Sequence, residues 1–345
     1  METGPLSSRA AVRGNEVFAM TCFDAHSDLL YDVTRRSLAG ETRVLETHHL
    51  DRLRRGGVEG LVLACWYGAG DGHTFWKDVP GAGSDAARLR IMADCARAEL
   101  AQCTEIRLVR TVKEAEEARA AGQIYAFLGI EGMAAFDGDA DGIDRFYALG
   151  GRLGMLTWNE ENAFAAGAGA DPEKGLTDRG RAAVRRMEDL GMVVDVSHLS
   201  DGGFWDVMDL AAGPVIASHS NCRALCDVRR NLTDDQLRAI RDSGGVVGLN
   251  VYHSFVHADP AKQTAETLAL HAARMAEVMG IEHVGCGFDF CEFFGPPDND
   301  GAAGLEDASR IGNLFCALEK LGMSRRERAL IARENFLRVF RQVLG

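Results

Sequence analysis

The chain has 345 residues, 46% of them hydrophobic and 26% charged, a composition that excludes a disordered chain, a collagen-like chain and a disulfide scaffold. Its formal net charge of −13 argues against a nucleic-acid partner, which would require a basic face, and favours a neutral or cationic small molecule. The nine cysteines are scattered, no basic start precedes an apolar stretch, and no 18 apolar residues run together, so we expect a cytoplasmic protein without a membrane span.

Short β-rich runs alternate with longer helical patterns, which is typical of βα units and a parallel sheet. Several helices are predicted to begin at capping boxes, where Thr111, Thr233 and Ser324 are each followed three residues later by Glu or Gln. Eight such units in a chain of this length predict an α/β fold, a (β/α)8 TIM-type barrel that forms one domain over residues 1–345. The predicted strands are 17–22, 60–65, 124–130, 152–157, 192–197, 214–218, 246–250 and 283–289, with an extra short candidate at 107–109.

Polar residues follow these strands where a barrel enzyme builds its site, at the carboxyl ends. Any one of them alone would be interpreted as a solvated loop residue or a helix cap. Together, three histidines and three carboxylates on five strands would converge on one small volume, and carboxylates so close need a cation between them. In chain order the residues are His26 and Asp28, Glu131, Trp158 and Asn159, His198, His219, Tyr252, and Asp289.

The chemistry of these side chains suggests two ions. His198 and His219 on adjacent strands can hold one ion, His26 and Asp28 can hold another, and Glu131 can bridge them. Mixed imidazole and carboxylate ligands favour Zn²⁺, although Co²⁺, Mn²⁺ or Fe²⁺ would also fit. Such a pair shares a hydroxide that serves as the nucleophile. Asp289 would then be free to act as general base and acid.

Further motifs accompany these residues, and together they are specific. They are Asp24-Ala25-His26-Ser27-Asp28, Gly129-Ile130-Glu131-Gly132, Gly175-Leu176-Thr177, Asp195-Val196-Ser197-His198, Ser218-His219-Ser220, Arg229-Arg230-Asn231, Gly287-Phe288-Asp289-Phe290, Gly304-Leu305-Glu306-Asp307 and the segment 334–340. With them the chain resembles the membrane (renal) dipeptidase family of binuclear zinc metallopeptidases, within the amidohydrolase-like barrels. The resemblance extends from about Phe23 to the C-terminus and is to soluble, bacterial-type members.

The resemblance implies a role for each matching residue. It implies that His26 and Asp28 bind one zinc ion and that Glu131 bridges to the second. The second ion would be bound by His198 and His219, with Asp289 as the acid/base. Arg230 would clamp the terminal carboxylate of the substrate through its planar fork.

Two positions depart from the family pattern. Where many members have a Thr-His pair after the fourth strand, this chain has Thr157-Trp158-Asn159. Asn159 could donate a hydrogen bond in place of that histidine, or Trp158 could wall the pocket. Near Asp289 one of two usual acidic positions is Cys291.

The leading hypothesis is a dipeptidase that hydrolyses small dipeptides, including those with a C-terminal D-residue, as the family does. The alternatives are hydrolysis of another small amide or a lactone by the same metal pair, and a catalytically silent metal-binding barrel. Retention of all five ligands and of Asp289 argues against the silent barrel. No nucleic acid or membrane partner is expected, and a homodimer is a possible assembly.

Overall fold

The computed structural model of the chain describes residues 20–68, 74–295 and 301–345. Its strands are all parallel. They form a sheet of order β1-β2-β4-β5-β6-β7, in which β3 also pairs with the start of β4, and a second pair β8-β9. The strands are β1 (Cys22–Ser27), β2 (Val58–Cys65), β3 (Ile106–Leu108), β4 (Ile124–Glu131), β5 (Gly151–Met155), β6 (Val193–Asp195), β7 (Val215–Ile216), β8 (Val247–Leu249) and β9 (Val284–Cys286).

Two seams join the second pair to the larger sheet. At one seam a parallel bridge pairs Ala217, after β7, with Val247 of β8. At the other, Asp24 Oδ1 accepts a hydrogen bond from the backbone N–H of Phe288 at 2.8 Å, which ties β1 to the segment after β9. The sheet therefore curls through all the strands except β3 into the predicted barrel.

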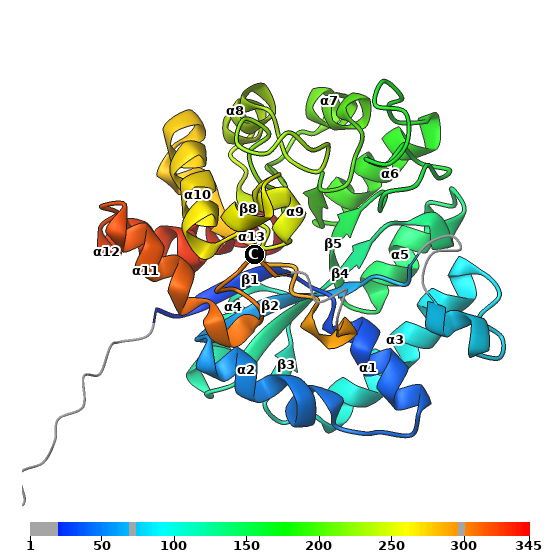
Figure 1. The fold of residues 1–345 in the computed structure, drawn as a ribbon. Helices are drawn as coiled ribbons and strands as arrows, with labels where there is room; N and C mark the ends of the chain where they lie inside the picture. The colour runs from blue at the N-terminus through cyan, green and yellow to red at the C-terminus, as the bar shows by residue number, and fades with distance from the viewer. Residues whose placement is uncertain (1–19, 69–73, 296–300) are drawn as a thin grey trace, which may run out of the picture.

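Helices lie outside the curled sheet, and Figure 1 shows them around the strands. No helix of the described residues is long and apolar enough to cross a membrane. The helices are α1 (Leu29–Leu38), α2 (Leu50–Arg55), α3 (Asp85–Gln102), α4 (Val112–Ala120), α5 (Asp141–Ala148), α6 (Asp178–Asp189), α7 (Asp201–Leu210), α8 (Asp234–Asp242), α9 (His253–Val256), α10 (Ala265–Met279), α11 (Gly312–Lys320), α12 (Arg325–Ala329) and α13 (Asn335–Leu344).

The predicted strands are confirmed from the second onward, within a few residues at each end, and β3 confirms the extra candidate. The first prediction was wrong in its position. The strand begins at Cys22 and contains the motif that was expected to follow it, while residues 17–19 lie outside the described part of the chain. The buried side chains of this segment, Phe23 among them, prefer the interior of the sheet to a loop.

Two of the three predicted capping boxes are present, at Thr233 and Ser324. The third is only half formed. Thr111 accepts from the backbone N–H of Glu114, but the Glu114 carboxylate accepts from the N–H of Arg110 instead of that of Thr111. Because the carboxylate still satisfies an N–H at the helix start, α4 keeps its cap.

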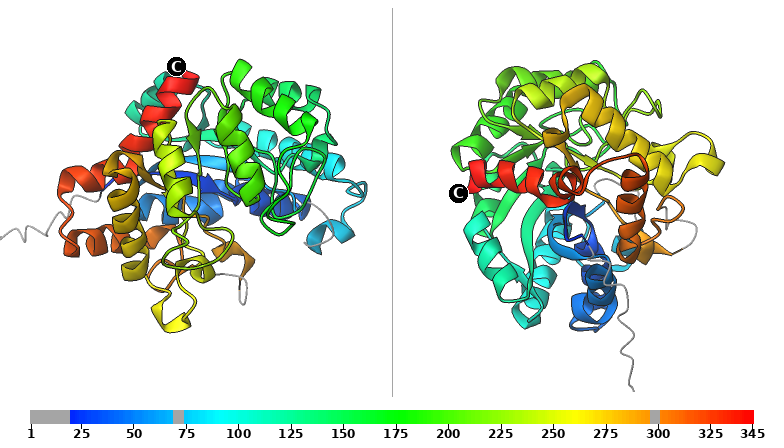
Figure 2. Two further views of the ribbon diagram at one scale, coloured as in Figure 1. Left: turned by 90° about the horizontal axis from the view of Figure 1, so that it is seen from above. Right: turned by 90° about the vertical axis from the view of Figure 1, so that its left-hand side faces the viewer.

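The barrel interior is filled by large apolar side chains, and α13 closes one end of the barrel. Phe340 of α13 is fully buried, with its ring centroid 5.4 Å from Phe23 of β1 and 4.9 Å from Phe127 of β4. Figure 2 shows α13 (red) at the end of the barrel away from α9. A barrel packed solid at this end leaves room for a site only at the other, where the strands end.

Because α13 closes this end of the barrel, removal of one of its buried rings should lower the stability of the protein strongly. Phe340→Ala should lower the free energy of unfolding by about 3–5 kcal/mol, because the removed ring leaves a cavity between strands and helix. Denaturant unfolding measures this value. Arg341→Ala, on the exposed side of the same helix and paired with Glu116, is the control and should change it by less than about 1 kcal/mol. An equal loss of unfolding free energy in the two variants would contradict the role given to α13.

Candidate active site

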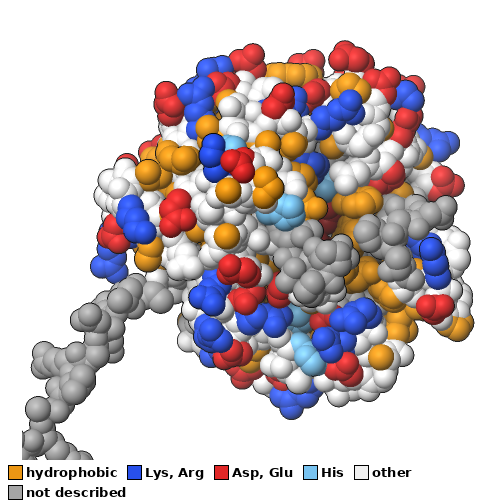
Figure 3. Space-filling model, viewed as in Figure 1, with side chains coloured by type: hydrophobic (Ala, Val, Ile, Leu, Met, Phe, Trp, Pro, Cys, Tyr) orange, Lys and Arg blue, Asp and Glu red, His pale blue; other side chains and the backbone are white. Residues whose placement is uncertain are grey.

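The carboxyl ends of the strands surround a cavity of about 380 Å³. Figure 3 shows histidine and acidic side chains around a hollow in this face. The cavity is lined by Asp28, Trp66, Glu131, Trp158, Asn159, His198, Tyr252, Phe255, Asp289, Cys291 and Phe294. Six of the residues predicted for the site therefore reach it along with Asp289, and His26 and His219 lie buried beneath.

One half of the site is centred on His26. Its Nε2 lies 3.2 Å from Glu131 Oε2, 3.6 Å from Asp28 Oδ1 and 3.9 Å from Asp289 Oδ1. The pairing of β1 with β2 is irregular between Asp24 and Ser27, and such irregularities re-aim side chains at strand ends. Three carboxylates therefore surround one buried imidazole.

The other half contains the two remaining histidines. His198 Nδ1 lies 3.0 Å from Asn159 Oδ1, which can only accept, so this nitrogen carries the proton and Nε2 presents a lone pair. That Nε2 lies 2.8 Å from Glu131 Oε1 and 2.9 Å from His219 Nε2. Since His198 Nε2 and the Glu131 oxygen meet as acceptors, a cation between them would relieve their repulsion.

Several polar atoms here are buried with no hydrogen-bond partner among the described residues. They include both ring nitrogens of His26, Asp28 Oδ1 and Glu131 Oε2. Groups of atoms close enough to bind one ion are formed by His26, Glu131 and His219, and by His26, Asp28 and Asp289. Unpaired buried donors and acceptors are costly, so this donor set fits metal ions, with nitrogen and oxygen ligands suited to a transition metal.

The electrostatics of the site follow from its burial. Burial lowers the pKa of His26, but Glu131 and Asp28 outweigh this and hold it well above its ordinary value. Burial is also the largest cause that raises the pKa of Glu131 and of Asp289. The pKa of His198 falls well below its ordinary value because the ring is buried. His198 is thus kept neutral, which is the form that binds a metal.

Two site residues have a left-handed backbone that non-glycine residues seldom adopt. The φ angle is 69° at His198 and 60° at Asp289. This conformation costs of order 1–3 kcal/mol per residue and occurs mainly where function requires it. Here it turns each side chain inward directly after its strand. Histidine and aspartate adopt this conformation more often than most residues, but the residue type alone does not show at which positions they do so.

Two buried aspartates that sequence reasoning missed hold the strand ends in place. Asp24 Oδ1 accepts from the backbone N–H of His26 at 3.3 Å as well as from Phe288. Asp195 Oδ1 accepts from the N–H groups of Ser197 and Ser218, each one residue before a histidine of the site. The signal available in the sequence was an aspartate two or three residues before each of two site histidines.

The remaining predicted residues lie around the candidate metal ligands. Arg230 is buried, donates to the carbonyl of His219 at 3.2 Å and lies over the Phe255 ring. Trp158 lines the cavity with its ring 6.3 Å from that of His198. Tyr252 lines the opposite wall, where its N–H donates to Asn250 Oδ1. Asn250 was not predicted, and its Nδ2 donates to Asp289 Oδ2 at 3.0 Å.

The membrane dipeptidase model, peptidase family M19, matches residues 16–344. The chain belongs to this family. As a member of the membrane dipeptidase family it is a metallopeptidase that hydrolyses a peptide bond, which confirms the family, the fold and the reaction predicted from the sequence.

Solved structures support the same assignment. A dipeptidase of family M19 is 27% identical, with a TM-score of 0.80, 95% of this chain covered and 99% of the other. A metallopeptidase from Rhodobacter sphaeroides, liganded with a phosphinate mimic of the dipeptide L-Ala-D-Ala, has the same identity and TM-score, with 95% and 100% covered.

Curated sequence relatives include one that is named a dipeptidase. A protein from the pqqA 5′ region of Klebsiella pneumoniae is 35% identical over 69% of this chain and 89% of its own length. A Schizosaccharomyces pombe dipeptidase is 37% identical over 63% of this chain. The match spans 53% of the length of that yeast protein, so it bears on the shared part only.

Proposed function

We propose that the chain is a dipeptidase with two transition ions, preferably Zn²⁺, at the end of the barrel. His26 and Asp28 would hold one ion, His198 and His219 the other, and Glu131 would bridge them. The observation that carries this proposal is the set of lone pairs that face one another around Glu131, with buried oxygens and nitrogens that have no hydrogen-bond partner among the described residues.

The ions would supply a Lewis acid for the scissile carbonyl and a water of lowered pKa. Asp289 would take the proton of the attacking water and pass it to the leaving nitrogen. Asn250 supports this role, because its hydrogen bond to Asp289 Oδ2 leaves Oδ1 turned toward His26. Asn159 holds the proton of His198 on Nδ1, which keeps Nε2 available as a ligand.

The proposed substrate is a dipeptide with a free carboxylate, held by Arg230. This side chain is buried, yet its Nε has no hydrogen-bond partner among the described residues. An anion at that point would supply the missing acceptor. The dipeptide mimic bound to the Rhodobacter relative ends in D-Ala, which supports acceptance of a C-terminal D-residue here too.

The first test is metal content. Purified protein should carry about two transition ions per chain, and His198→Ala or His219→Ala should lose one of them, as measured by elemental analysis. His48→Ala, whose ring pairs with Glu41 outside the site, is the matched control and should keep both. Protein that binds no ion and is not activated by added Zn²⁺ or Mn²⁺ would contradict the two-ion proposal.

A second test addresses proton transfer. Asp289→Asn should keep fold and metal content but lower kcat by roughly 10²–10⁴, the usual contribution of a general acid/base. The asparagine can still accept from Asn250, so the local geometry should persist. Asp259→Asn, at an exposed turn, should leave kcat unchanged. Loss of metal together with activity would instead make Asp289 a ligand.

A third test separates dipeptides from other substrates. Arg230→Met should raise KM for dipeptides about 10- to 100-fold, because a hydrogen bond to a charged group contributes about 1.5–3 kcal/mol. Arg229→Met, its exposed neighbour, is the control. Amidation of the substrate carboxylate should raise KM for the wild-type enzyme. In Arg230→Met it should raise KM little further. Equal cleavage of amidated and free dipeptides, or cleavage only of a lactone or another amide, would favour the alternative function.

A further inference from the structure

Three aromatic rings form a concave wall on one side of the catalytic cavity. Trp66 directly follows β2, Trp158 follows β5, and Phe294 ends the short 3-10 helix η6 (Glu292–Phe294) after β9. The Trp66 ring lies 5.6 Å from that of Trp158, inclined by 60°, and 6.1 Å from that of Phe294, inclined by 90°. At these distances the rings are in edge contact with one another, so together they present one continuous apolar surface to the cavity.

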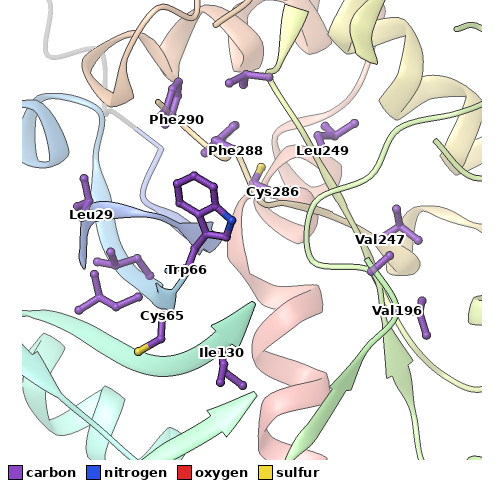
Figure 4. Close-up of a cluster of buried hydrophobic side chains, with 14 of the residues drawn as sticks. Leu29, Cys65, Trp66, Ile130, Val196, Val247, Leu249, Cys286, Phe288 and Phe290 are labelled. Atoms are coloured by element: carbon purple, nitrogen blue, oxygen red, sulfur yellow. The ribbon is translucent and has the colours of Figure 1, made fainter. Parts of the chain in front are cut away.

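The wall is supported from behind. Tyr31 of α1 is buried, with its ring 5.1 Å from Trp66 and 5.0 Å from Phe294. Figure 4 shows the Trp66 indole amid buried side chains, with Phe288 and Phe290 on one side of it and Leu29 and Cys65 on the other. Trp66 itself is only 6% exposed. A group that binds here therefore meets a preformed surface and need not order it first.

The charges around the wall select against one class of side chain. Among the described residues that line the cavity, the carboxylates are Asp28, Glu131 and Asp289, and no lysine or arginine is present. An acidic side chain that packs against the rings would lose its water without meeting a lysine or arginine among these lining residues. A large apolar side chain would lose unfavourable contact with water.

The position of Arg230 decides which part of a dipeptide meets this wall. Arg230 contacts His219, after β7, and its guanidinium lies over Phe255, after β8. Trp66 follows β2, which lies across the curled sheet from β7, and Phe294 comes from the segment after β9; both strands flank β1. With its carboxylate at Arg230, a dipeptide spans the ligands and directs its N-terminal residue toward the wall.

We infer that Trp66, Trp158 and Phe294 form the subsite for the side chain of the N-terminal residue, and that the enzyme selects dipeptides with a large apolar residue there. The inference rests on the proposed dipeptidase function and on Arg230 as the carboxylate clamp. It names the substrate class that the family assignment leaves open.

The wild-type enzyme provides the first part of the test. Leu-Ala and Phe-Ala should be cleaved with a kcat/KM about 10- to 100-fold above that of Ala-Ala, the range expected for burial of a large apolar side chain. Asp-Ala should fall below Ala-Ala. Ala-Leu, which places the same side chain at the other end, should gain much less. Equal rates for Leu-Ala and Ala-Ala would overturn the inference while leaving the dipeptidase function intact, whereas no cleavage of any dipeptide would overturn that function itself.

Variants of the wall residues test whether these rings produce the substrate preference. Phe294→Ala should reduce the ratio of Leu-Ala to Ala-Ala in kcat/KM about 10-fold, chiefly through KM, while metal content stays at the wild-type value. Phe294→Leu should restore most of the wild-type ratio. Phe75→Ala removes a ring that packs on Tyr31 but does not line the cavity, and should keep the wild-type ratio.

Thermal unfolding establishes that each variant is folded. Should Phe294→Ala fail to fold, Trp158→Ala replaces it, with the same expected loss of ratio. A folded wall variant that keeps the wild-type ratio would overturn the assignment of these rings.

Discussion

The buried carboxylate of Glu131 is the group on which the site depends, because its two oxygens lie within 4.0 Å of three imidazole nitrogens, those of His26, His198 and His219. Burial of a carboxylate is costly unless charge or hydrogen bonds offset it. Neutral His198 and His219 cannot provide that charge, and His26 is shared with two other carboxylates. A metal ion would supply the missing charge, in keeping with the metallopeptidase family of the chain, which requires the barrel to hold these side chains close together.

The barrel meets this requirement through a few buried contacts at its strand ends. Asp24 and Asp195 each accept backbone N–H groups from two neighbouring segments, so each fixes a strand end together with the histidine that follows. At the opposite end α13 fills the barrel with Phe336 and Phe340. The stability of the packed end can offset the strain at His198 and Asp289.

Membership of the membrane dipeptidase family accounts for the metallopeptidase reaction. The walls of the cavity include Trp158 and, beside Asp289, Cys291. Asn159 contacts His198 Nδ1 through the oxygen of its amide, which orients this ring. Five aromatic side chains, those of Trp66, Trp158, Tyr252, Phe255 and Phe294, line the same cavity, so apolar surface surrounds much of its polar centre.

The sequence by itself determined the order of strands, the barrel and the residues at its carboxyl ends, because alternation of β-rich and helical runs allows few topologies. It also pointed to Glu131, His198 and His219 as neighbours, since residues at the carboxyl ends of barrel strands converge on one volume. The tertiary structure alone decided the position of β1, whose buried residues prefer the sheet, and the roles of Asp24 and Asn250. Those roles depend on contacts between segments up to 264 residues apart, such as that of Asp24 with Phe288. Local sequence patterns carry no information on such contacts, since they arise only when the barrel closes.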